Sequence, residues 1–476
     1  MAMKLALVSG DGLPVSGLLT VFRNIIELGL KENLVKLPVP ADLGYSWRPD
    51  KPQFFPCGTS ALKYPDWLIV TDAVPMCVSS ASFAEELIAI RCDVAHAEML
   101  NPAERYSLHQ RVEVIANAYE QHFSLWFAEH NVDWVCAINM TLSDAVPVTI
   151  GLHRAVSRRW NGGRLGGILF WDHDLFASYS VYDRGIRMYP QYPNEFTPLP
   201  GTHQSHRWTV VSDQLAKEAT TYATPLCPVV VPNVLPTVPY KRLEERHHKF
   251  LTQLDVDLRR PVVLAPVRVF RVKGVEISIS LLAAVRNASR HRNEPPPYLF
   301  VFGDLDEDPD YAHDILATAE REGVQTDVRF LDGVPLSSHQ DTAGRWHLDE
   351  VDLLRISVAS GGGVFFTPNR PDVESVGLGP ALAAVAGVPC AVTPYNAFDE
   401  VYGSDFARVQ VYPDRLWQAG DEFLDWMIAR RQGEHKIQAL LDANRDRVLQ
   451  RFPCEPWQTL LRNMAALVDS HATPNN

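Results

Sequence analysis

Two cations follow a short apolar stretch in the second half of the chain. Residues 262–265 predict a buried strand, and Arg268 and Lys273 come directly after it, with Gly274 opening the next helix. Two fixed cations at the end of a strand suit a diphosphate leaving group, because they stabilise the negative charge that grows as the bond to it breaks. They need no metal ion to do so. A solvated basic turn, which would also contain Arg271, is the plain structural alternative.

A carboxylate and a glycine-rich turn follow a later strand. Residues 363–367 predict that strand, and the segment Glu374-Ser-Val-Gly-Leu-Gly-Pro380 leads from it into a helix. Backbone N–H groups at a helix N-terminus bind anions, and the carboxylate of Glu374 can accept hydrogen bonds from sugar hydroxyls. An ordinary strand-to-helix turn with an exposed glutamate is the alternative. The candidate binding residues of this turn are Ser375, Val376, Gly377, Leu378 and Gly379.

A histidine and an aspartate follow a strand in the first half. Residues 167–171 predict the strand, and His173 and Asp174 come just after it. In open α/β sheets, ligands bind at the carboxyl ends of the strands. The pair is therefore a candidate for holding a sugar. A capping aspartate beside a hydrogen-bonded histidine is the alternative.

The first loop of the chain is rich in glycine. Gly10 and Gly12 follow a predicted strand at residues 4–8. Glycines at this place let a backbone approach a ligand closely. The loop lacks the spacing of the known phosphate-binding loops, so we treat both residues as candidate donor contacts only.

The elements that must position these residues alternate between short apolar runs and helical stretches, which is typical of parallel sheets covered by helices. Strands are predicted at residues 4–8, 67–70, 134–138, 167–171 and 209–211, and again at 262–265, 298–302, 328–330, 363–367 and 390–393. Helices are predicted at residues 16–30, 103–129, 241–254, 275–288, 312–322, 378–386 and 456–470. The fold class is therefore α/β, with two Rossmann-like halves.

The length of the chain also favours two domains. Its 476 residues exceed the ~250–300 at which a single core stops growing, and prolines at 232, 236 and 239 interrupt both helix and strand. We predict domains at residues 1–236 and 237–454. An amphipathic helix within residues 455–476 is expected to return to the first domain, and packing on the second domain is the alternative.

Composition excludes several classes of protein. The net charge of −13 argues against a nucleic-acid binder. No apolar run approaches the ~20 residues of a membrane span, and the first residues do not resemble a signal peptide. The seven cysteines are scattered, which predicts reduced thiols in the cytoplasm. The sixteen histidines show no metal-ligand spacing, so neither a metal site nor a cofactor is expected.

Taken together, the motifs resemble the retaining glycosyltransferases of the GT-B fold, the large group that includes sucrose-phosphate synthases, glycogen synthases and many bacterial hexosyltransferases. The resemblance runs nearly end to end. The matching segments are Trp171-Asp-His173-Asp174, Val211-Ser-Asp-Gln-Leu215 with Val231-Pro-Asn233, Arg268 to Gly274, Phe302-Gly303-Asp304, Phe330-Leu-Asp-Gly333, Glu374-Ser-Val-Gly-Leu378 and Ala386-Gly-Val-Pro389.

This resemblance implies two Rossmann-like domains facing a cleft, and transfer of a hexosyl group from a nucleotide-diphosphate sugar with retention of configuration and without a metal. Arg268 and Lys273 would hold the diphosphate, and Glu374 would bond the donor sugar. His173 would contact the transferred sugar near the reacting face. The donor site would also include Gly303 and the turn from Gly377 to Gly379.

One position departs from the family's pattern. The family carries a second glutamate eight residues after the first, and it grips the nucleotide ribose. Here that position is Leu382, whose side chain cannot accept hydrogen bonds. The identity of the nucleotide and the residue that holds its ribose are therefore left open.

Two other functions stay open at this stage. A disaccharide phosphorylase of the same fold would use Arg268 and Lys273 to hold inorganic phosphate. A catalytically silent subunit that binds sugars or nucleotides is the second alternative, although it would not need all four of the polar candidates. The long loops at residues 45–60 and 179–206 are the candidate acceptor contacts.

Overall fold

The chain forms two compact α/β units. The computed structural model describes residues 2–10, 17–48, 64–75, 81–142, 144–178, 182–183, 186–239 and 242–469. One unit comprises Met1–Asn233 together with Cys454–Asn476, and the other comprises Val234–Pro453. The expected α/β class with two Rossmann-like halves is confirmed, and so is the return of the C-terminal helix to the first half.

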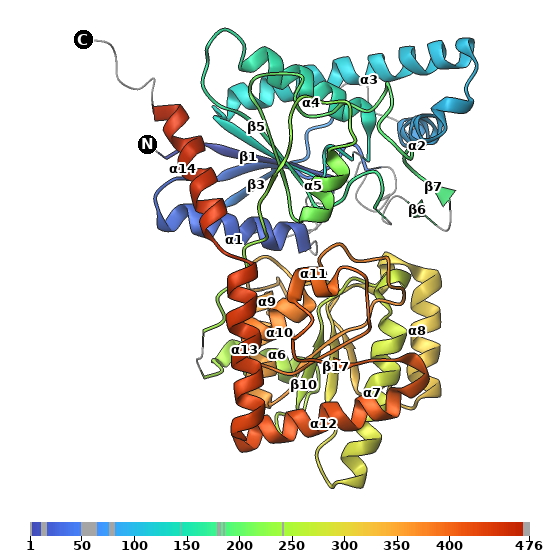
Figure 1. Ribbon diagram of the computed structural model, residues 1–476, viewed down its shortest axis with the longest axis vertical. Coiled ribbons are helices and arrows are strands. Elements are labelled where there is room, and N and C mark those ends of the chain that lie inside the picture. The colour runs from blue at the N-terminus through green and yellow to red at the C-terminus, as the bar shows by residue number, and fades with distance from the viewer. Residues whose placement is uncertain are drawn as a thin grey trace. The chain divides into compact units, whose positions relative to one another are not determined.

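The first unit is built on a seven-stranded sheet whose paired strands are parallel (Figure 1), in the order β3-β2-β1-β4-β5-β8-β9. Its strands are β1 (Leu5–Ser9), β2 (Val39–Asp42), β3 (Leu68–Thr71), β4 (Trp134–Ile138), β5 (Gly167–Asp172), β8 (His206–Val210) and β9 (Val229–Val230), with a small antiparallel pair formed by β6 (Tyr182–Asp183) and β7 (Ile186–Arg187). Its α-helices are α1 (Gly17–Lys31), α2 (Ala81–Ala95), α3 (Pro102–Glu129), α4 (Val146–Arg159), α5 (Asp213–Ala219) and α14 (Glu455–Asp469).

The second unit repeats this plan with a six-stranded parallel sheet, in the order β12-β11-β10-β15-β16-β17. Its strands are β10 (Val262–Ala265), β11 (Tyr298–Val301), β12 (Val328–Phe330), β15 (Val364–Phe366), β16 (Cys390–Val392) and β17 (Val409–Gln410), and β13 (His339–Gln340) pairs with β14 (Trp346–His347) in a separate hairpin. Its helices are α6 (Glu245–Gln253), α7 (Val275–His291), α8 (Pro309–Arg321), α9 (Glu350–Ser360), α10 (Gly379–Ala386), α11 (Phe398–Tyr402), α12 (Leu416–Gln432) and α13 (His435–Arg451), with 3₁₀ turns η4 (Arg271–Lys273) and η5 (Leu305–Glu307).

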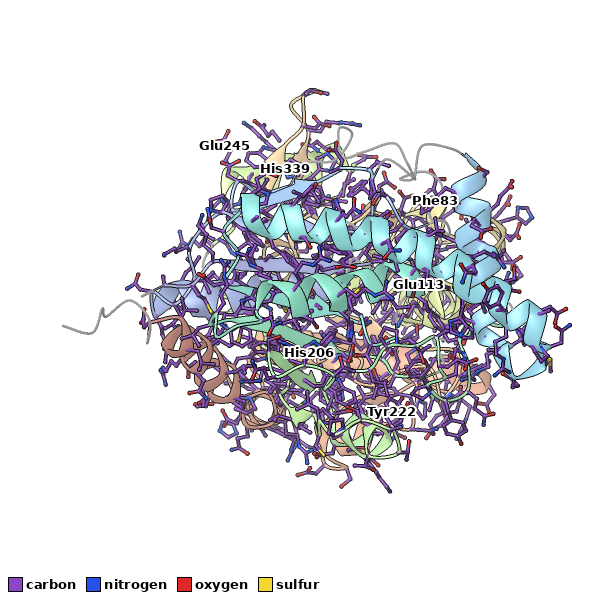
Figure 2. The ribbon with its side chains drawn as sticks, turned by 90° about the horizontal axis from the view of Figure 1, so that it is seen from above. Phe83, Glu113, His206, Tyr222, Glu245 and His339 are labelled. Carbon is purple, nitrogen blue, oxygen red and sulfur yellow. The ribbon has the colours of Figure 1, made fainter. Side chains whose placement is uncertain are left out.

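Both sheets are covered on two faces, as expected for parallel strands joined by helices. The central strands β1, β4 and β5 are buried along their whole length, and so are β10, β11 and β15. In the first unit, α3 and α4 lie side by side (Figure 2), and Arg154 of α4 pairs with Glu113 of α3 at 2.6 Å. Each sheet therefore leaves mainly the ends of its strands for binding.

The strand order reverses direction once in each unit. In the first unit, the reversal lies between β1 and β4, and in the second it lies between β10 and β15. Loops that leave neighbouring strands on opposite sides of such a point diverge, and ligands of open α/β sheets bind in the resulting crevice. The loops after β10 and β15 carry Lys273 and Glu374, and the loop after β1 carries Gly10.

The C-terminal helix α14 is held in the first unit by two tryptophans. Trp457 is only 1 % exposed, its Nε1 donates to the carbonyl of Pro232 at 3.0 Å, and its ring lies 4.8 Å from that of Trp171. Trp134 of β4 donates to the carbonyl of Met464 at 3.1 Å. Segments distant in the sequence are thus joined in one core (Figure 1).

We predict that Trp457→Ala destabilises the first unit by about 3–5 kcal/mol, because it removes a fully buried indole and leaves a cavity. Trp417→Ala is the matched control, since Trp417 is 65 % exposed and its loss is expected to stay within about 0.5 kcal/mol. Urea unfolding followed by far-ultraviolet circular dichroism measures both. Equal midpoints for the two variants would show that α14 adds little to the stability of this unit.

Candidate active site

The loop after β10 requires glycine at position 274. Arg271 to Lys273 form the turn η4, and Gly274 follows in the left-handed region with φ of +61°. A Cβ atom at Gly274 would lie 2.0 Å from the carbonyl oxygen of Thr367, so no side chain fits there. This close approach brings the loop after β10 directly onto the loop after β15.

Hydrogen bonds connect the same two loops. The Thr367 hydroxyl donates to the carbonyl of Gly274 at 2.9 Å and lies 2.6 Å from the hydroxyl of Ser278. The backbone N–H of Asn369 donates to the carbonyl of Val272 at 3.2 Å. Since Lys273 and Glu374 are carried by these two loops, their relative position is set by the backbone.

Lys273 and Glu374 form an ion pair at the end of the sheet. Lys273 Nζ lies 2.6 Å from Glu374 Oε1, and the two side chains are 27 % and 9 % exposed. The ammonium group is therefore reachable from solvent, while the carboxylate is largely covered. The structure brings these two candidate residues into direct contact.

Arg268 lies on the same loop and is anchored by a carboxylate that the sequence reasoning missed. Its Nε donates to Glu307 Oε1 at 2.8 Å, and the N–H of Val269 donates to Glu307 Oε2 at 2.7 Å. The guanidinium carbon lies 4.6 Å from the centre of the Phe270 ring. Gly303 supports the loop from β11, since its N–H donates to the carbonyl of Val267 at 3.0 Å.

The turn before α10 is fastened from the core. Tyr395 donates its hydroxyl to the carbonyl of Val376 at 2.9 Å, and Tyr402 donates to that of Gly377 at 2.6 Å. The helix begins at Gly379 without a side-chain cap on its first amides. Ser375 and Leu378 are half-buried in the same turn. The turn is thus a rigid helix start of the type that accepts an anion.

Leu382 lies one turn further along α10 and is part of the core. Its side chain is 4 % exposed, and every residue of the helix is buried. The side chain therefore presents almost no surface to a ligand.

In the first unit, one asparagine organises the segment after β5. Asn139 follows β4 in the left-handed region with φ of +53°. Its Oδ1 accepts the backbone N–H of His173 at 2.7 Å and that of Asp174 at 3.3 Å. The imidazole of His173 is buried against Trp171, with ring centres 4.7 Å apart. His173 and Asp174 therefore share one anchor.

Asp172, the last residue of β5, is a fully buried carboxylate beside this pair. It accepts a hydrogen bond from Trp208 Nε1 at 2.7 Å and a longer one from the N–H of Thr141 at 3.4 Å. Burial, the largest cause, and the nearby Asp174 raise the pKa of Asp172, the hydrogen bonds from Thr141 and Trp208 lower it, and the net pKa is about 7.

The end of β1 is occupied by the chain's own side chains. Arg48 donates to the carbonyl of Gly10 and pairs with Asp144 at 3.1 Å, and Tyr189 donates to Asp144 at 2.7 Å. A Cβ atom at Gly10 would lie 2.7 Å from Asp144 Oδ2. A larger residue at this position would therefore displace the side chain of Asp144. Gly12 lies outside the described residues.

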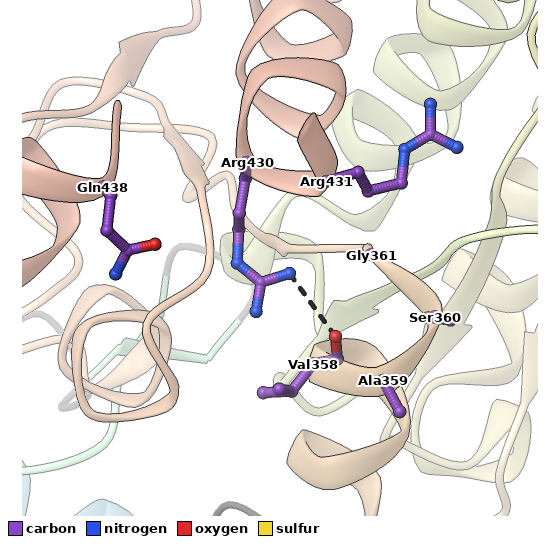
Figure 3. Close-up of a pocket in the computed structure, with 7 residues that line it drawn as sticks. All are labelled: Val358, Ala359, Ser360, Gly361, Arg430, Arg431 and Gln438. Atoms are coloured by element: carbon purple, nitrogen blue, oxygen red, sulfur yellow. Dashed lines mark hydrogen bonds between the residues drawn. The ribbon is translucent and has the colours of Figure 1, made fainter. Parts of the chain in front are cut away.

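A surface pocket of about 340 Å³ lies in the second unit, at the end of the sheet where β15 begins (Figure 3). It surrounds the C-terminal end of α9, from Val358 to Gly361, just before the chain enters β15. Arg430 donates to the carbonyls of Gly387 and Val358, at 2.7 and 3.4 Å, and caps this end of the sheet. The pocket is therefore separate from the candidate site, which lies where the strands end.

The described residues contain neither a cluster of metal-ligating side chains nor a membrane-spanning helix. No group of three or more His, Cys, Asp or Glu side chains in this part of the chain is arranged to hold a metal ion. None of the described helices combines the length and apolar character needed to span a membrane.

By sequence, the chain matches no protein-family model and no curated protein. By structure, it is similar over nearly its whole length to solved glycosyltransferases. One from Rickettsia africae has a TM-score of 0.56 at 13 % identity, covering 98 % of this chain and 99 % of its own. Sucrose-phosphate synthase from Thermosynechococcus elongatus has a TM-score of 0.55 at 13 % identity, covering 99 % and 100 %. HepE of Anabaena, solved with UDP-glucose, has a TM-score of 0.54 at 14 % identity, covering 98 % and 100 %.

At these identities the similarity establishes the fold. The chain has the GT-B fold of glycosyltransferases, as its motifs predicted. Sequence reasoning found the residues that follow strand ends. It missed their anchors Glu307 and Asn139, although Asn139 follows β4 and could have been found by the same rule.

Ionisation of Asp172 gives a testable pH dependence. An unfolded aspartate ionises near pH 3.8, whereas Asp172 in the folded protein ionises near 7. The unfolded state therefore binds fewer protons between these values, and the stability that Asp172 contributes is lost as the pH rises from about 4 to 7. We predict that Asp172→Asn removes this loss. Melting temperatures of both proteins from pH 4 to 8 measure it, and a constant difference between them would contradict it.

The difference in melting temperature between the wild type and Asp172→Asn is free of the pH dependence that two buried histidines contribute. Their contribution to stability changes with pH in the opposite direction. Burial lowers the pKa of His206 to about 4 and that of His153 well below its usual value. Both groups cost stability as the pH falls below about 6.5, in the wild type and the variant alike.

Proposed function

We propose that this chain is a retaining, metal-independent glycosyltransferase that moves a hexosyl group from a nucleotide-diphosphate sugar to a small-molecule or glycan acceptor. The observation that carries the proposal is the contact between Lys273 and Glu374. It joins the loops after β10 and β15, where the strand order reverses, and Arg268 lies on the first of these loops. A cation for phosphate and a carboxylate for hydroxyls are thus side by side.

In this proposal, Arg268 and Lys273 hold the donor diphosphate and stabilise its charge as the glycosidic bond breaks. A bound phosphate competes with Glu374 for the ammonium group of Lys273. The released carboxylate then accepts hydrogen bonds from the hydroxyls of the donor sugar. Amides at the start of α10 add further donors for the phosphate or the sugar.

No carboxylate nucleophile is needed in this scheme. The acceptor attacks on the face that the diphosphate leaves, and the departing phosphate oxygen takes the proton of the acceptor hydroxyl. The glycosidic bond breaks, the new bond forms on the same face, and the configuration is retained. The protein contributes orientation and electrostatic stabilisation.

A nucleotide-sugar donor is supported by the fold neighbours. HepE of Anabaena, whose fold this chain shares, was solved with UDP and with UDP-glucose. Leu382 offers no hydrogen bond to a ribose and is buried. We therefore propose that the ribose is held by groups other than the side chain at position 382.

The first unit is proposed to bind the acceptor, and His173 of this unit is proposed to contact a sugar. Among the candidate acceptor loops, the described residues Tyr45 to Arg48 are buried. Tyr45 is bonded to Tyr64, with 2.6 Å between their hydroxyl oxygens. The residues from Tyr45 to Arg48 therefore lie in the interior of the first unit, beside the end of β1. The segment after β7, which contains the exposed Tyr192, is the better candidate for acceptor contacts.

We predict that Arg268→Ala and Lys273→Ala each lower kcat by about 10²–10³-fold, the effect of removing one preorganised donor from a site of developing negative charge. Arg271→Ala is the matched control. Arg271 lies between them on the same loop, but it is 57 % exposed and pairs with Asp314. Transfer assays with a panel of nucleotide sugars measure all three variants.

Equal activity of the Arg268, Lys273 and Arg271 variants would remove the diphosphate role from this loop. If the wild-type protein transfers no sugar but releases a sugar 1-phosphate from a disaccharide and inorganic phosphate, it is a phosphorylase. Each variant must melt near the temperature of the wild type, so that a loss of activity is not caused by unfolding.

We also predict that transfer continues in excess EDTA, because Arg268 and Lys273 supply the positive charge that a metal would otherwise supply to the leaving diphosphate. A metal-dependent glycosyltransferase assayed in the same buffer serves as the control for chelation. Loss of activity that Mg²⁺ or Mn²⁺ restores would contradict this part of the proposal.

A further inference from the structure

The guanidinium of Arg268 is held on one side only. Its Nε donates to Glu307 Oε1 at 2.8 Å, and its face lies over the ring of Phe270. Within the part of the chain that the structure describes, its two terminal nitrogens, Nη1 and Nη2, donate no hydrogen bond. Arg268 is 20 % exposed, so the edge that carries these nitrogens remains available to an anion.

Glu307 is built to hold a fixed position. It ends the 3₁₀ turn η5, in which Asp304 accepts a hydrogen bond from the N–H of Asp306 at 2.9 Å, and its side chain is only 10 % exposed. Its second oxygen accepts the backbone N–H of Val269 at 2.7 Å. One carboxylate therefore fixes both the side chain of Arg268 and the backbone that follows it.

A second pair on the same loop shows the contrast. Arg271 pairs with Asp314 at 2.8 Å, but these side chains are 57 % and 52 % exposed. An exposed pair of this kind is screened by water and holds its partners weakly. The pair between Arg268 and Glu307 is mostly covered, and it includes a backbone hydrogen bond, so it constrains geometry in a way that the exposed pair does not.

We propose that Glu307 is a positioning residue that presents the free edge of Arg268 to the donor diphosphate. This inference rests on the proposed function of Arg268. The inference also predicts the direction in which removal of Glu307 changes diphosphate binding. A carboxylate beside the site lowers the local positive charge, so its removal would tighten diphosphate binding if charge alone mattered. If Glu307 acts by orienting the guanidinium, its removal weakens binding and turnover, because catalysis depends on a preorganised donor.

The test is a double-mutant cycle on the full chain. The proteins are the wild type, Glu307→Gln, Arg268→Ala and the double variant, with Asp314→Asn as the matched control on the exposed pair. Transfer kinetics give kcat and KM, and calorimetry gives the affinity for UDP and for inorganic pyrophosphate. We expect Glu307→Gln to lower kcat/KM by about 10–10²-fold and to weaken pyrophosphate binding. Adding it to Arg268→Ala should change neither quantity by more than about twofold.

Three results would overturn the inference. They are tighter pyrophosphate binding in Glu307→Gln, an equal loss of activity on adding Glu307→Gln to Arg268→Ala, and a loss in Asp314→Asn as large as that in Glu307→Gln. If Glu307→Gln does not fold, Glu307→Asp takes its place. It keeps the charge and shortens the reach, and the inference then requires a lower kcat at a melting temperature near that of the wild type. Full activity in Glu307→Asp would contradict the inference.

Failure of the proposed function has a different signature. A wild-type protein that transfers no sugar from any nucleotide sugar, but loses pyrophosphate affinity in Glu307→Gln, would keep the inference and reject the function. Full transfer activity in the wild type together with additive losses in the cycle would keep the function and reject the inference. A wild-type protein that neither transfers sugar nor binds pyrophosphate would reject both.

Discussion

The candidate donor site depends on one close contact between two backbones. Because Gly274 has no Cβ, its α-carbon can lie against the carbonyl of Thr367, and the Thr367 hydroxyl can reach the carbonyl of Gly274. Any side chain at Gly274 would push the loop after β10 away from the loop after β15. The ion pair between Lys273 and Glu374 would then separate, since each loop carries one of its members.

Charge compensation is the second feature of this site. Lys273 and Arg268 are both partly covered, and each has a carboxylate partner, Glu374 or Glu307. A buried cation without a partner would cost several kcal/mol of stability, so these carboxylates allow the cations to be held in place before a ligand arrives. The partners differ in their connections. Glu374 bonds only Lys273 among the described residues, whereas Glu307 also holds the backbone of Val269. In the proposed mechanism, a phosphate therefore replaces Glu374 at Lys273, and the contacts of Glu307 with the loop stay in place.

The sequence predicted the features that depend on residues close to one another in the chain. Apolar runs gave the central strands, and the polar residues just after them gave Lys273, Glu374 and His173, because parallel strands end at one edge. The strand Val39–Asp42 was missed because Pro38 and Pro40 argue against a strand. The anchor Glu307 was missed because it lies 39 residues from Arg268 in the chain, and only the adjacency of β10 and β11 brings them together.

Position 382 shows how packing decides the chemistry that a helix can offer. All eight residues of α10 are buried, and the helix lies between β15 and α13. A glutamate at 382 would have to lose its hydration and find partners here, whereas a buried leucine stabilises the fold by about 1.5–3 kcal/mol. No N-cap side chain bonds the start of the same helix, where Gly379 is followed by Pro380, which has no N–H to donate. Packing of α10 therefore leaves position 382 no part in ligand binding and confines the proposed ligand contacts of this helix to its first turn.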